Sequence, residues 1–311
     1  ELEFGTDARF FNDRVNLELT NYHTPSRDAL IAQTIAPSAG SAATTVLANL
    51  GEVRNWGYEA LLNAQLVSRR NFAWDATVSA SRNSNELLTL GNDAAGKPIP
   101  PIIGTSTQQR PGYPLNGCWQ RGFSYNDANK DGIIVPAEVT IDTAVTFQGY
   151  SQPRLELTFV NGFDLFNRRL RISSLIDHKS GYKVLNSEQQ FLCQQSLSCK
   201  ATSSHDATVY EQARAIAQRF KTPQTTAGYM EDVTFTRIRE LSATYNVESA
   251  WAQRLLKAQS VGIVFAVRNL AVFTDWTGVD PEQNYGEANL QQTLLTAGPP
   301  RYFTFRVNLR Y

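Results

Sequence analysis

Hydrophobic and polar residues alternate along most of this chain, and this pattern constrains the fold more than any other feature. The segment 301–311 shows it most clearly. Its two sets of alternating residues are Phe303, Phe305, Val307, Leu309 and Tyr311 on one face, and Thr304, Arg306, Asn308 and Arg310 on the other. Successive side chains of a β-strand point to opposite faces, so a period of two predicts strands with one apolar and one polar face.

The same alternation predicts about nine strands in an all-β fold. The expected strands are 2–10, 14–36, 53–67, 71–83, 153–165, 169–180, 231–247, 260–275 and 301–311. Soluble sheets usually have strands of about five or six residues. A tilted strand needs about 9–11 residues to cross a membrane. Strand length therefore favours an antiparallel transmembrane β-barrel.

Short and long connections alternate along the chain. Tight turns are expected at 11–14, 68–71 and 166–169, and long loops at 37–52, 84–152, 181–230 and 277–300. One short helix is expected in the connection Glu248–Lys257. Outer-membrane barrels have short periplasmic turns and long extracellular loops, and we place the two kinds of connection accordingly. Bacterial barrels have even strand numbers, so about nine strands predict a part of a larger barrel.

Composition excludes several classes of protein. Lys and Arg number 29 against 29 Asp and Glu, so the formal net charge is zero. Nucleic acid is not expected as a partner, because phosphate binding requires a concentrated positive surface. The chain contains no apolar run long enough for a transmembrane helix. This absence leaves a β-barrel open, because its alternating hydropathy averages out.

Several motifs then resemble one family. They are the segments 50–59 (LGEVRNWGYE), 72–75 (FAWD) with 81–86 (SRNSNE), 111–115 (PGYPL), 235–245 (FTRIRELSATY) and 268–270 (RNL) with 273–282 (FTDWTGVDPE). Each is weak alone, but their order over nearly the whole chain resembles SusC/RagA-type TonB-linked outer-membrane proteins. The final strand also resembles the aromatic-ended strand that the barrel-insertion machinery recognises in such proteins.

The resemblance implies that residues 1–311 are the carboxy-terminal part of a plugged barrel with roughly 22 strands. The plug domain and the early strands would be absent from this sequence. The implied function is TonB-dependent import of a glycan, oligosaccharide or peptide across the bacterial outer membrane. The implied partners are a SusD-like surface lipoprotein, outer-membrane lipid, and TonB through the missing amino-terminal region. The implied insertion signal is Phe303, Phe305, Val307, Leu309 and Tyr311.

One loop carries a calcium motif. Residues 127–138 fit D-x-[DN]-x-[DN]-G-x5-E at every required position. Ca²⁺ takes six to eight oxygen ligands. The expected ligands are side-chain oxygens of Asp127, Asn129, Asp131 and Glu138 and the carbonyl of Ile133. A solvated turn rich in Asp, Asn and Gly is the alternative.

The three cysteines divide into a pair and a single residue. Cys193 and Cys199 lie six positions apart in an expected external loop. An oxidising compartment favours a disulfide between them over two free thiols. Cys118 is expected to be a small buried residue rather than a reactive thiol.

The period becomes helical between Thr208 and Thr222. Thr208 and Glu211 have the spacing of a capping box. Tyr210, Ala213, Ala217 and Phe220 share one helix face. This face either packs on neighbouring loops or contacts a lid partner, and the sequence leaves both open.

Three functions compete on these observations. The first is the importer, and the second is a soluble calcium-binding β-sandwich with an adhesive or carbohydrate-binding role. The third is an outer-membrane enzyme with carboxylates in its lumen. Asp280 and Glu282 are close enough in sequence for a carboxylate pair, but Asp-Pro-Glu in a loop is more often a turn. No catalytic motif is present, and we expect no enzyme. An outward apolar belt would exclude the sandwich, and a second sheet packed on Leu155, Phe159, Phe303, Phe305 and Leu309 would exclude the barrel. No substrate-binding residue is predicted.

Overall fold

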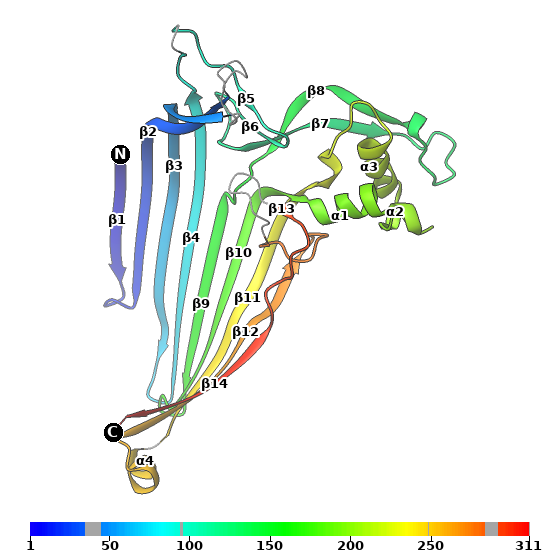
Figure 1. Cartoon of the computed structure of the whole chain (residues 1–311). Coiled ribbons are helices and arrows are strands. Elements are labelled where there is room, and N and C mark those ends of the chain that lie inside the picture. The colour runs from blue at the N-terminus through cyan, green and yellow to red at the C-terminus, as the bar shows by residue number, and fades with distance from the viewer. Residues whose placement is uncertain (35–44, 94–95, 248, 284–291, 311) are drawn as a thin grey trace.

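A computed structural model describes residues 1–34, 45–93, 96–247, 249–283 and 292–310. Nine long antiparallel strands in this part of the chain follow one another, in chain order, in a single curved sheet (Figure 1). They are β1 (Leu2–Phe10), β2 (Val15–Thr34), β3 (Thr45–Ser68), β4 (Phe72–Thr89), β9 (Leu155–Leu165), β10 (Leu170–Asn186), β11 (Met230–Val247), β12 (Ser260–Thr274) and β14 (Tyr302–Arg310). The predicted strands and their antiparallel order are confirmed.

The connections separate to opposite ends of the sheet. Three successive residues in each of two tight turns adopt left-handed conformations; in the β1–β2 turn, Phe11, Asn12 and Asp13 have φ angles of +57°, +55° and +61°. The predicted helix α4 (Ser249–Leu256) joins β11 to β12 at this same end. The long connections lie at the other end (Figure 1).

Some strands are longer than predicted. β3 begins at Thr45 rather than residue 53, and β4 continues to Thr89 rather than residue 83. The pairing of β2 with β3 shifts register around Ala29, and that of β3 with β4 shifts between Glu52 and Val53. The backbone hydrogen bonds between these strands therefore continue beyond the bulges. The alternation of apolar and polar residues is lost there, because backbone pairing alone does not require an apolar face.

The long connections contain more structure than the sequence predicts. The segment 84–152 was expected to be one loop, but it holds a second antiparallel sheet of β5 (Ile102–Ile103), β6 (Thr107–Gln109), β7 (Gly117–Tyr125) and β8 (Val139–Gly149). A short strand β13 (Gln292–Thr293) pairs in parallel with β10. The helical elements are α1 (Ser187–Phe191), the π-helix η3 (Leu192–Ser196), α2 (Lys200–Ser203) and α3 (Val209–Arg219), with short 3-10 turns at Pro136–Glu138 and Ala227–Tyr229.

Most clusters of buried apolar residues lie toward the long-loop end rather than along the long strands. One cluster holds Cys118, Leu185, Cys193, Cys199, Ala215, Tyr229 and Met230, and another holds Ile134, Val139, Ala213, Ile216 and Ala217. We call this structured end, formed by β5–β8 and α1–α3, the rim. The rim has its own small cores, and the long strands pack mainly through their backbone ladders.

No helix in the described ranges has the length and apolar character needed to span a membrane.

Candidate functional site

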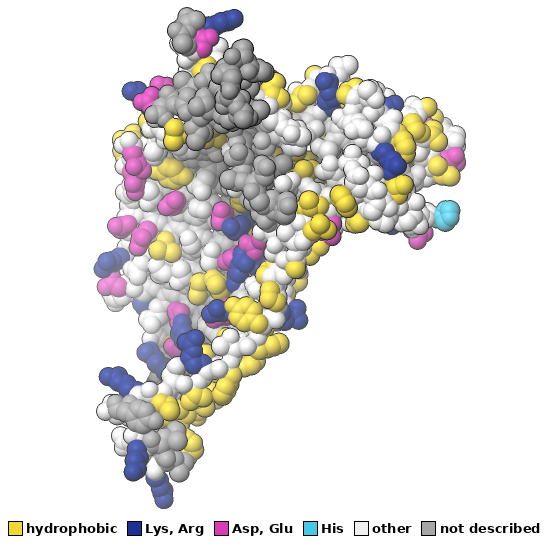
Figure 2. Space-filling model, viewed as in Figure 1, with side chains coloured by type: hydrophobic (Ala, Val, Ile, Leu, Met, Phe, Trp, Pro, Cys, Tyr) yellow, Lys and Arg dark blue, Asp and Glu magenta, His cyan; other side chains and the backbone are white. Residues whose placement is uncertain are grey.

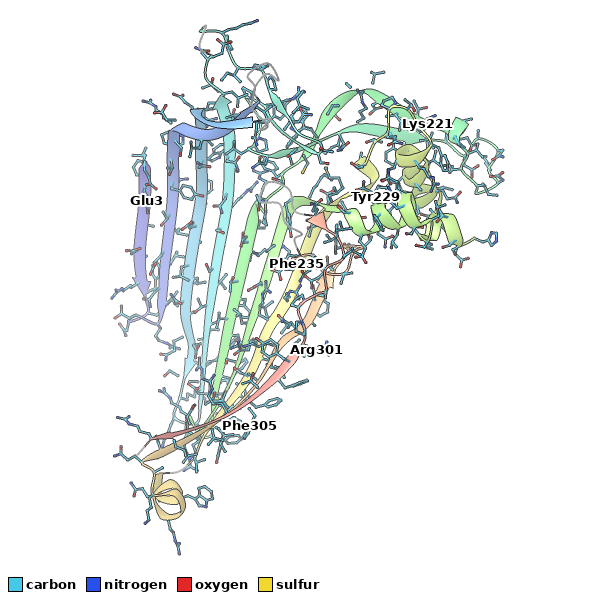
Figure 3. The ribbon with its side chains drawn as sticks, viewed as in Figure 1. Glu3, Lys221, Tyr229, Phe235, Arg301 and Phe305 are labelled. Atoms are coloured by element: carbon cyan, nitrogen blue, oxygen red, sulfur yellow. A yellow bond between two sulfur atoms is a disulfide. The ribbon has the colours of Figure 1, made fainter. Side chains whose placement is uncertain are left out.

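One face of the nine-stranded sheet is apolar. Directly paired residues of neighbouring antiparallel strands share a face. Phe305 on β14 pairs with Phe265 on β12, and this face can be followed from strand to strand through the paired residues. Phe303 and Phe305 are 67% and 68% exposed. In Figure 3 Phe305 lies on β14 well below the rim. We call this surface the apolar face; its members include Leu155, Leu157, Phe159, Phe163, Phe303, Phe305, Val307 and Leu309.

The exposure of this face decides between two of the hypotheses. The second sheet, β5–β8, lies at the rim and does not cover the long strands (Figure 1). A β-sandwich would bury these residues between two sheets, so the sandwich is excluded for the described residues. Four of the five proposed insertion-signal residues lie on β14, and Tyr311 lies outside the described residues.

The opposite face, which we call the polar face, carries ion pairs between strands. Arg171 on β10 binds Asp75 on β4 through two hydrogen bonds of 2.9 and 2.8 Å and also binds Asp164 on β9 at 3.1 Å. Figure 2 shows basic and acidic side chains interspersed over the sheet, and hydrophobic side chains along its β12–β14 edge. On this face, arginines of one strand are thus paired with carboxylates of neighbouring strands.

A glycine makes the Arg171 bridge possible. Arg171 must cross β9 to reach Asp75, and Gly162 lies between them on that strand. A Cβ atom at Gly162 would lie 2.9 Å from Asp75 Oδ2 and would also overlap the Arg171 guanidinium. The missing side chain therefore lets the arginine lie flat on the sheet.

The most deeply buried charges lie where the segment after β12 folds back on the sheet. Arg237 on β11 is 3% exposed and donates to both carboxylate oxygens of Asp280 at 2.8 and 2.6 Å. Its Nε lies 2.9 Å from Glu282, and Arg239 also contacts Glu282. Asp280 and Glu282 are therefore engaged by arginines, and they do not form the free carboxylate pair that an enzyme would need.

A hollow of about 260 Å³ lies near the top of the sheet. Its lining includes amide, phenol and carboxylate groups of Tyr22, Asn55, Asn83, Asn85 and Glu156. Tyr22 donates to Asn83 Oδ1 at 2.6 Å, and the Leu115 N–H donates to Asn85 Oδ1 at 2.7 Å. We call it the amide hollow. The sequence did not predict it, because its residues come from strands far apart in the chain.

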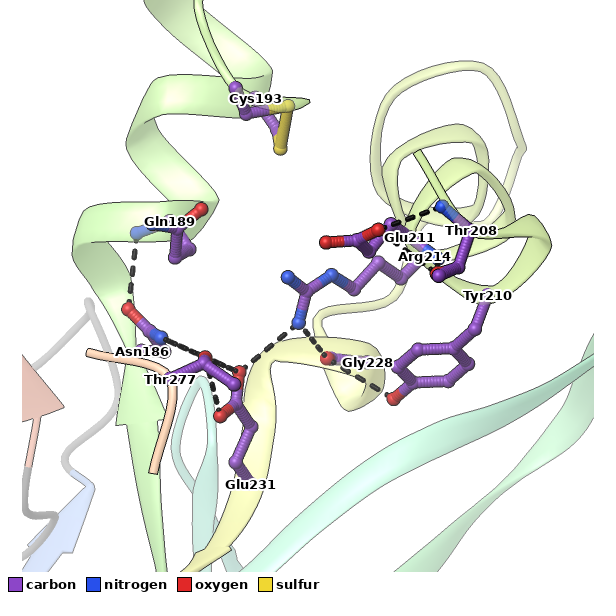
Figure 4. Close-up of polar contacts among 11 residues, drawn as sticks. Asn186, Gln189, Cys193, Thr208, Tyr210, Glu211, Arg214, Gly228, Glu231 and Thr277 are labelled. Atoms are coloured by element: carbon purple, nitrogen blue, oxygen red, sulfur yellow. Dashed lines mark hydrogen bonds and ion pairs between the residues drawn. A yellow bond between two sulfur atoms is a disulfide. The ribbon is translucent and has the colours of Figure 1, made fainter. Parts of the chain in front are cut away.

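A single carboxylate ties the rim to the sheet (Figure 4). Glu231, near the start of β11, accepts hydrogen bonds from Arg214 of α3 at 3.1 Å and from the Thr277 hydroxyl at 2.8 and 2.7 Å. Asn186, at the end of β10, donates to Thr277 at 2.9 Å, and its side chain caps α1 through Gln189 N–H at 3.1 Å. The end of β10, helix α3, the start of β11 and the segment after β12 are thereby joined at one point.

One side of helix α3 is packed against the rest of the rim, whereas the aromatic residues at its two ends are exposed. The predicted capping box is confirmed, with Thr208 and Glu211 bonded reciprocally. Ala213 and Ala217 are buried, whereas Phe220 and Tyr210 remain exposed. Tyr210 still stacks on Phe123 at a centroid distance of 6.1 Å. The two alanines therefore pack against the rim, and Phe220 is exposed.

The cysteines are placed as the sequence predicts. The Sγ atoms of Cys193 and Cys199 lie 2.14 Å apart in a disulfide. Cys118 is a free, buried thiol in the same apolar cluster. Burial raises the pKa of Cys118 to about 12, so the thiol stays protonated and unreactive near neutral pH.

The loop that carries the calcium motif has the turn that the motif requires. Gly132 has a φ of +77°, and its N–H donates to Asp127 at 3.0 Å. The Glu138 carboxylate accepts bonds from Ala128 and Val135, both at 3.1 Å. Within the described residues, no three His, Cys, Asp or Glu side chains are gathered as a metal site. The expected ligands Asp127, Asn129, Asp131, Ile133 and Glu138 thus share one loop, but its carboxylates bond to the loop backbone.

Comparison with known proteins gives a consistent result. The sequence model of the family described as "TonB dependent receptor-like, beta-barrel" matches residues 1–165. TonB-dependent receptor P3 of Formosa agariphila is 23% identical over 344 residues, covering 100% of this chain and 34% of the relative. TonB-dependent receptor SusC of Bacteroides thetaiotaomicron is 23% identical over 327 residues, covering 98% of this chain and 31% of the relative.

Solved structures show the same fold. The RagAB peptide transporter superposes with a TM-score of 0.73 at 18% identity, covering 99% of this chain and 34% of that one. The "open-open" state of the RagAB peptide importer gives a TM-score of 0.74 at 17% identity. The chain thus spans about a third of the length of the relatives it matches.

The names of these relatives describe receptors, and none of them supports the enzyme hypothesis. The family match covers more than half of the chain. The chain belongs to the TonB-dependent receptor-like β-barrel family of the bacterial outer membrane.

Proposed function

We propose that this chain is the carboxy-terminal barrel portion of a TonB-dependent importer that brings a nutrient across the outer membrane. The observation that carries the proposal is the division of nine long strands into an apolar and a polar face. An apolar outer face suits lipid, and a polar inner face with charges of both signs suits a wet lumen. The TonB-contacting region and the plug would belong to a preceding part of the receptor.

The proposed substrate is a glycan, an oligosaccharide or a peptide. The amide hollow supports this range, because amide and phenol groups donate to and accept from both sugar hydroxyls and peptide groups. Growth of a receptor-deleted strain on single peptide or glycan sources, restored by the intact receptor, would test it. Restoration on neither class would contradict the proposal.

We propose further that a SusD-like surface lipoprotein covers the rim. Exposed Phe220, directly after α3, supports a partner at this surface, since exposed aromatics are enriched at interfaces. Co-purification of the intact receptor with the lipoprotein encoded beside it should fall in Phe220→Asp. Asp206→Ala, an exposed rim residue that precedes the helix, is the matched control. Equal recovery of the lipoprotein from both variants would contradict a contact at Phe220.

The calcium assignment also remains a proposal. It is supported by the full motif and by the left-handed Gly132, and it requires the Asp131 and Glu138 carboxylates to turn from the loop backbone to the ion. Calorimetry of the intact receptor with Ca²⁺ should show a site that Asp131→Ala removes and Asp206→Ala retains. Unchanged affinity in Asp131→Ala would reject it, leaving a solvated turn.

The last strand is proposed as the insertion signal, through Phe303, Phe305, Val307 and Leu309 on its apolar face. Phe305→Asp should reduce the amount of folded receptor in the outer membrane more than Thr304→Asp on the polar face does. Equal assembly of the two variants would contradict recognition of this face.

A further inference from the structure

A groove of about 440 Å³ hollows the apolar face where β1–β4 approach β9. Ala60 and Ala80 face each other in register on β3 and β4 and form its floor. The larger side chains of Phe4, Leu19 and Leu155 stand around them. Small residues surrounded by large ones leave an apolar groove on this face, and its volume lies within the usual range of ligand sites, about 300–1,000 Å³.

The groove continues into a second, cationic hollow. That hollow has a volume of about 220 Å³, and Tyr58 and Arg82 line both spaces. Arg154 and Ser84 also line it, and Arg154 donates to Ser84 Oγ at 3.0 Å. Arg82 is exposed and makes no ion pair with any carboxylate of the described ranges, in contrast to Arg54, which pairs with Glu86. An apolar channel therefore ends at an uncompensated arginine.

The height of Arg82 on the barrel matches a lipid headgroup. Arg82 follows Phe72 by ten positions on β4, which at about 3.3 Å per residue and a tilt of about 40° gives a rise of about 25 Å. The apolar band of an outer-membrane barrel is about 25 Å tall, with aromatic residues at both borders. Phe72 stacks with Phe163 at the turn end, so Arg82 lies at the long-loop border, beside Trp56 and Tyr58.

We propose that this groove binds one phosphorylated lipid of the extracellular leaflet, with an acyl chain over Ala60 and Ala80 and the phosphate on Arg82 and Arg154. In an outer membrane, the phosphorylated lipid of that leaflet is lipid A. Guanidinium groups bind phosphate through paired charge-assisted hydrogen bonds. The proposal rests on the outer-membrane location of the family and is independent of what the receptor imports.

The test uses the intact receptor in nanodiscs of a zwitterionic phospholipid. Native mass spectrometry would measure binding of lipid A and of its dephosphorylated form to Arg82→Gln and Ala80→Leu receptors. The matched control is Arg306→Gln, which removes an exposed arginine from the polar face. Heat-dependent electrophoretic mobility confirms that each receptor is folded.

Loss of one charge-assisted contact should weaken binding of phosphorylated lipid A about tenfold in Arg82→Gln and leave the dephosphorylated form unaffected. Ala80→Leu, which fills the channel, should weaken both forms, and Arg306→Gln should weaken neither. The proposal is overturned if Arg82→Gln binds both lipids as the unchanged receptor does. It is also overturned if inorganic phosphate displaces the lipid and Ala80→Leu has no effect, because the site would then take a free anion. Dimerisation through this face without bound lipid would overturn it as well.

Discussion

A charge placed on the apolar face should be far more costly than one placed a single residue away. Val78 and Ser79 are neighbours on β4, and both are exposed. Val78 pairs with Phe159 on the apolar face, whereas Ser79 pairs with Thr158 on the polar face. Val78→Arg and Ser79→Arg therefore introduce the same side chain at nearly the same height on opposite faces.

The magnitude follows from depth in the membrane. Val78 lies six positions beyond Phe72, a rise of about 15 Å in a band about 25 Å tall, so it is close to the midplane. Arginine at the midplane of a barrel's lipid face costs about 2–4 kcal/mol. At 3 kcal/mol this lowers the folded-to-unfolded ratio about 150-fold. Ser79→Arg would face water and should change the free energy of unfolding by less than about 0.5 kcal/mol.

The assay is guanidinium unfolding of the intact receptor in lipid vesicles, followed by heat-dependent electrophoretic mobility. The midpoint should fall clearly for Val78→Arg and remain unchanged for Ser79→Arg. Equal midpoints, or a larger loss in Ser79→Arg, would refute the assignment of the two faces.

Arg237→Ala should cost about 3–5 kcal/mol, because it leaves the buried Asp280 carboxylate unpaired. Arg268→Ala, which breaks an exposed pair with Glu240, should leave the unfolding midpoint nearly unchanged, and equal losses in the two variants would contradict the buried cluster. Gly162→Val should cost about 1–3 kcal/mol by displacing Arg171 from Asp75, while Thr158→Val on the same face of β9 should be tolerated. Equal unfolding midpoints for the two variants would show that the Arg171–Asp75 ion pair does not require glycine at position 162. Iodoacetamide at pH 8 should add no group to Cys118, Cys193 and Cys199 of the folded receptor, as measured by intact mass. It should add one group after denaturation and three after denaturation with reduction. Three groups without reductant would disprove the disulfide.

The strands could be predicted because one physical requirement controls them. A face exposed to lipid must be apolar at every second position, and this leaves a period of two in segments such as Leu155–Leu165 and Tyr302–Arg310. Where a strand leaves the membrane, that requirement ends. The extension of β4 from Ser84 to Thr89 was therefore missed, although its backbone pairing continues.

The rim could not be predicted in the same way. β7 and β8 pack against loop elements such as α3, so neither strand has a uniformly apolar face. Helix α3 was recognised because its capping box is local in sequence. Helices α1 and α2 are too short for a periodic signal.

The polar contacts between distant segments left no pattern in the sequence. Arg237 and Asp280 are 43 positions apart, and Arg171 and Asp75 are 96 apart. Asp280 and Glu282 suggest a carboxylate pair in the sequence because their arginine partners, Arg237 and Arg239, lie about 43 positions away on β11. Strand register brings Arg171 to Asp75, whereas the segment after β12 folds back to bring Asp280 to Arg237.

The central claim is that the two faces of this sheet meet lipid and water, respectively. Nitroxide labels at successive cysteine substitutions from Leu155 to Phe163 on β9 would measure it in the intact receptor in bilayers, since Cys118 is buried and the other two cysteines are paired. Collision with oxygen should peak at Leu155, Leu157, Phe159 and Phe163, and collision with a water-soluble nickel complex at Glu156, Thr158 and Val160. Profiles without this alternation, or with the two sets exchanged, would contradict the account.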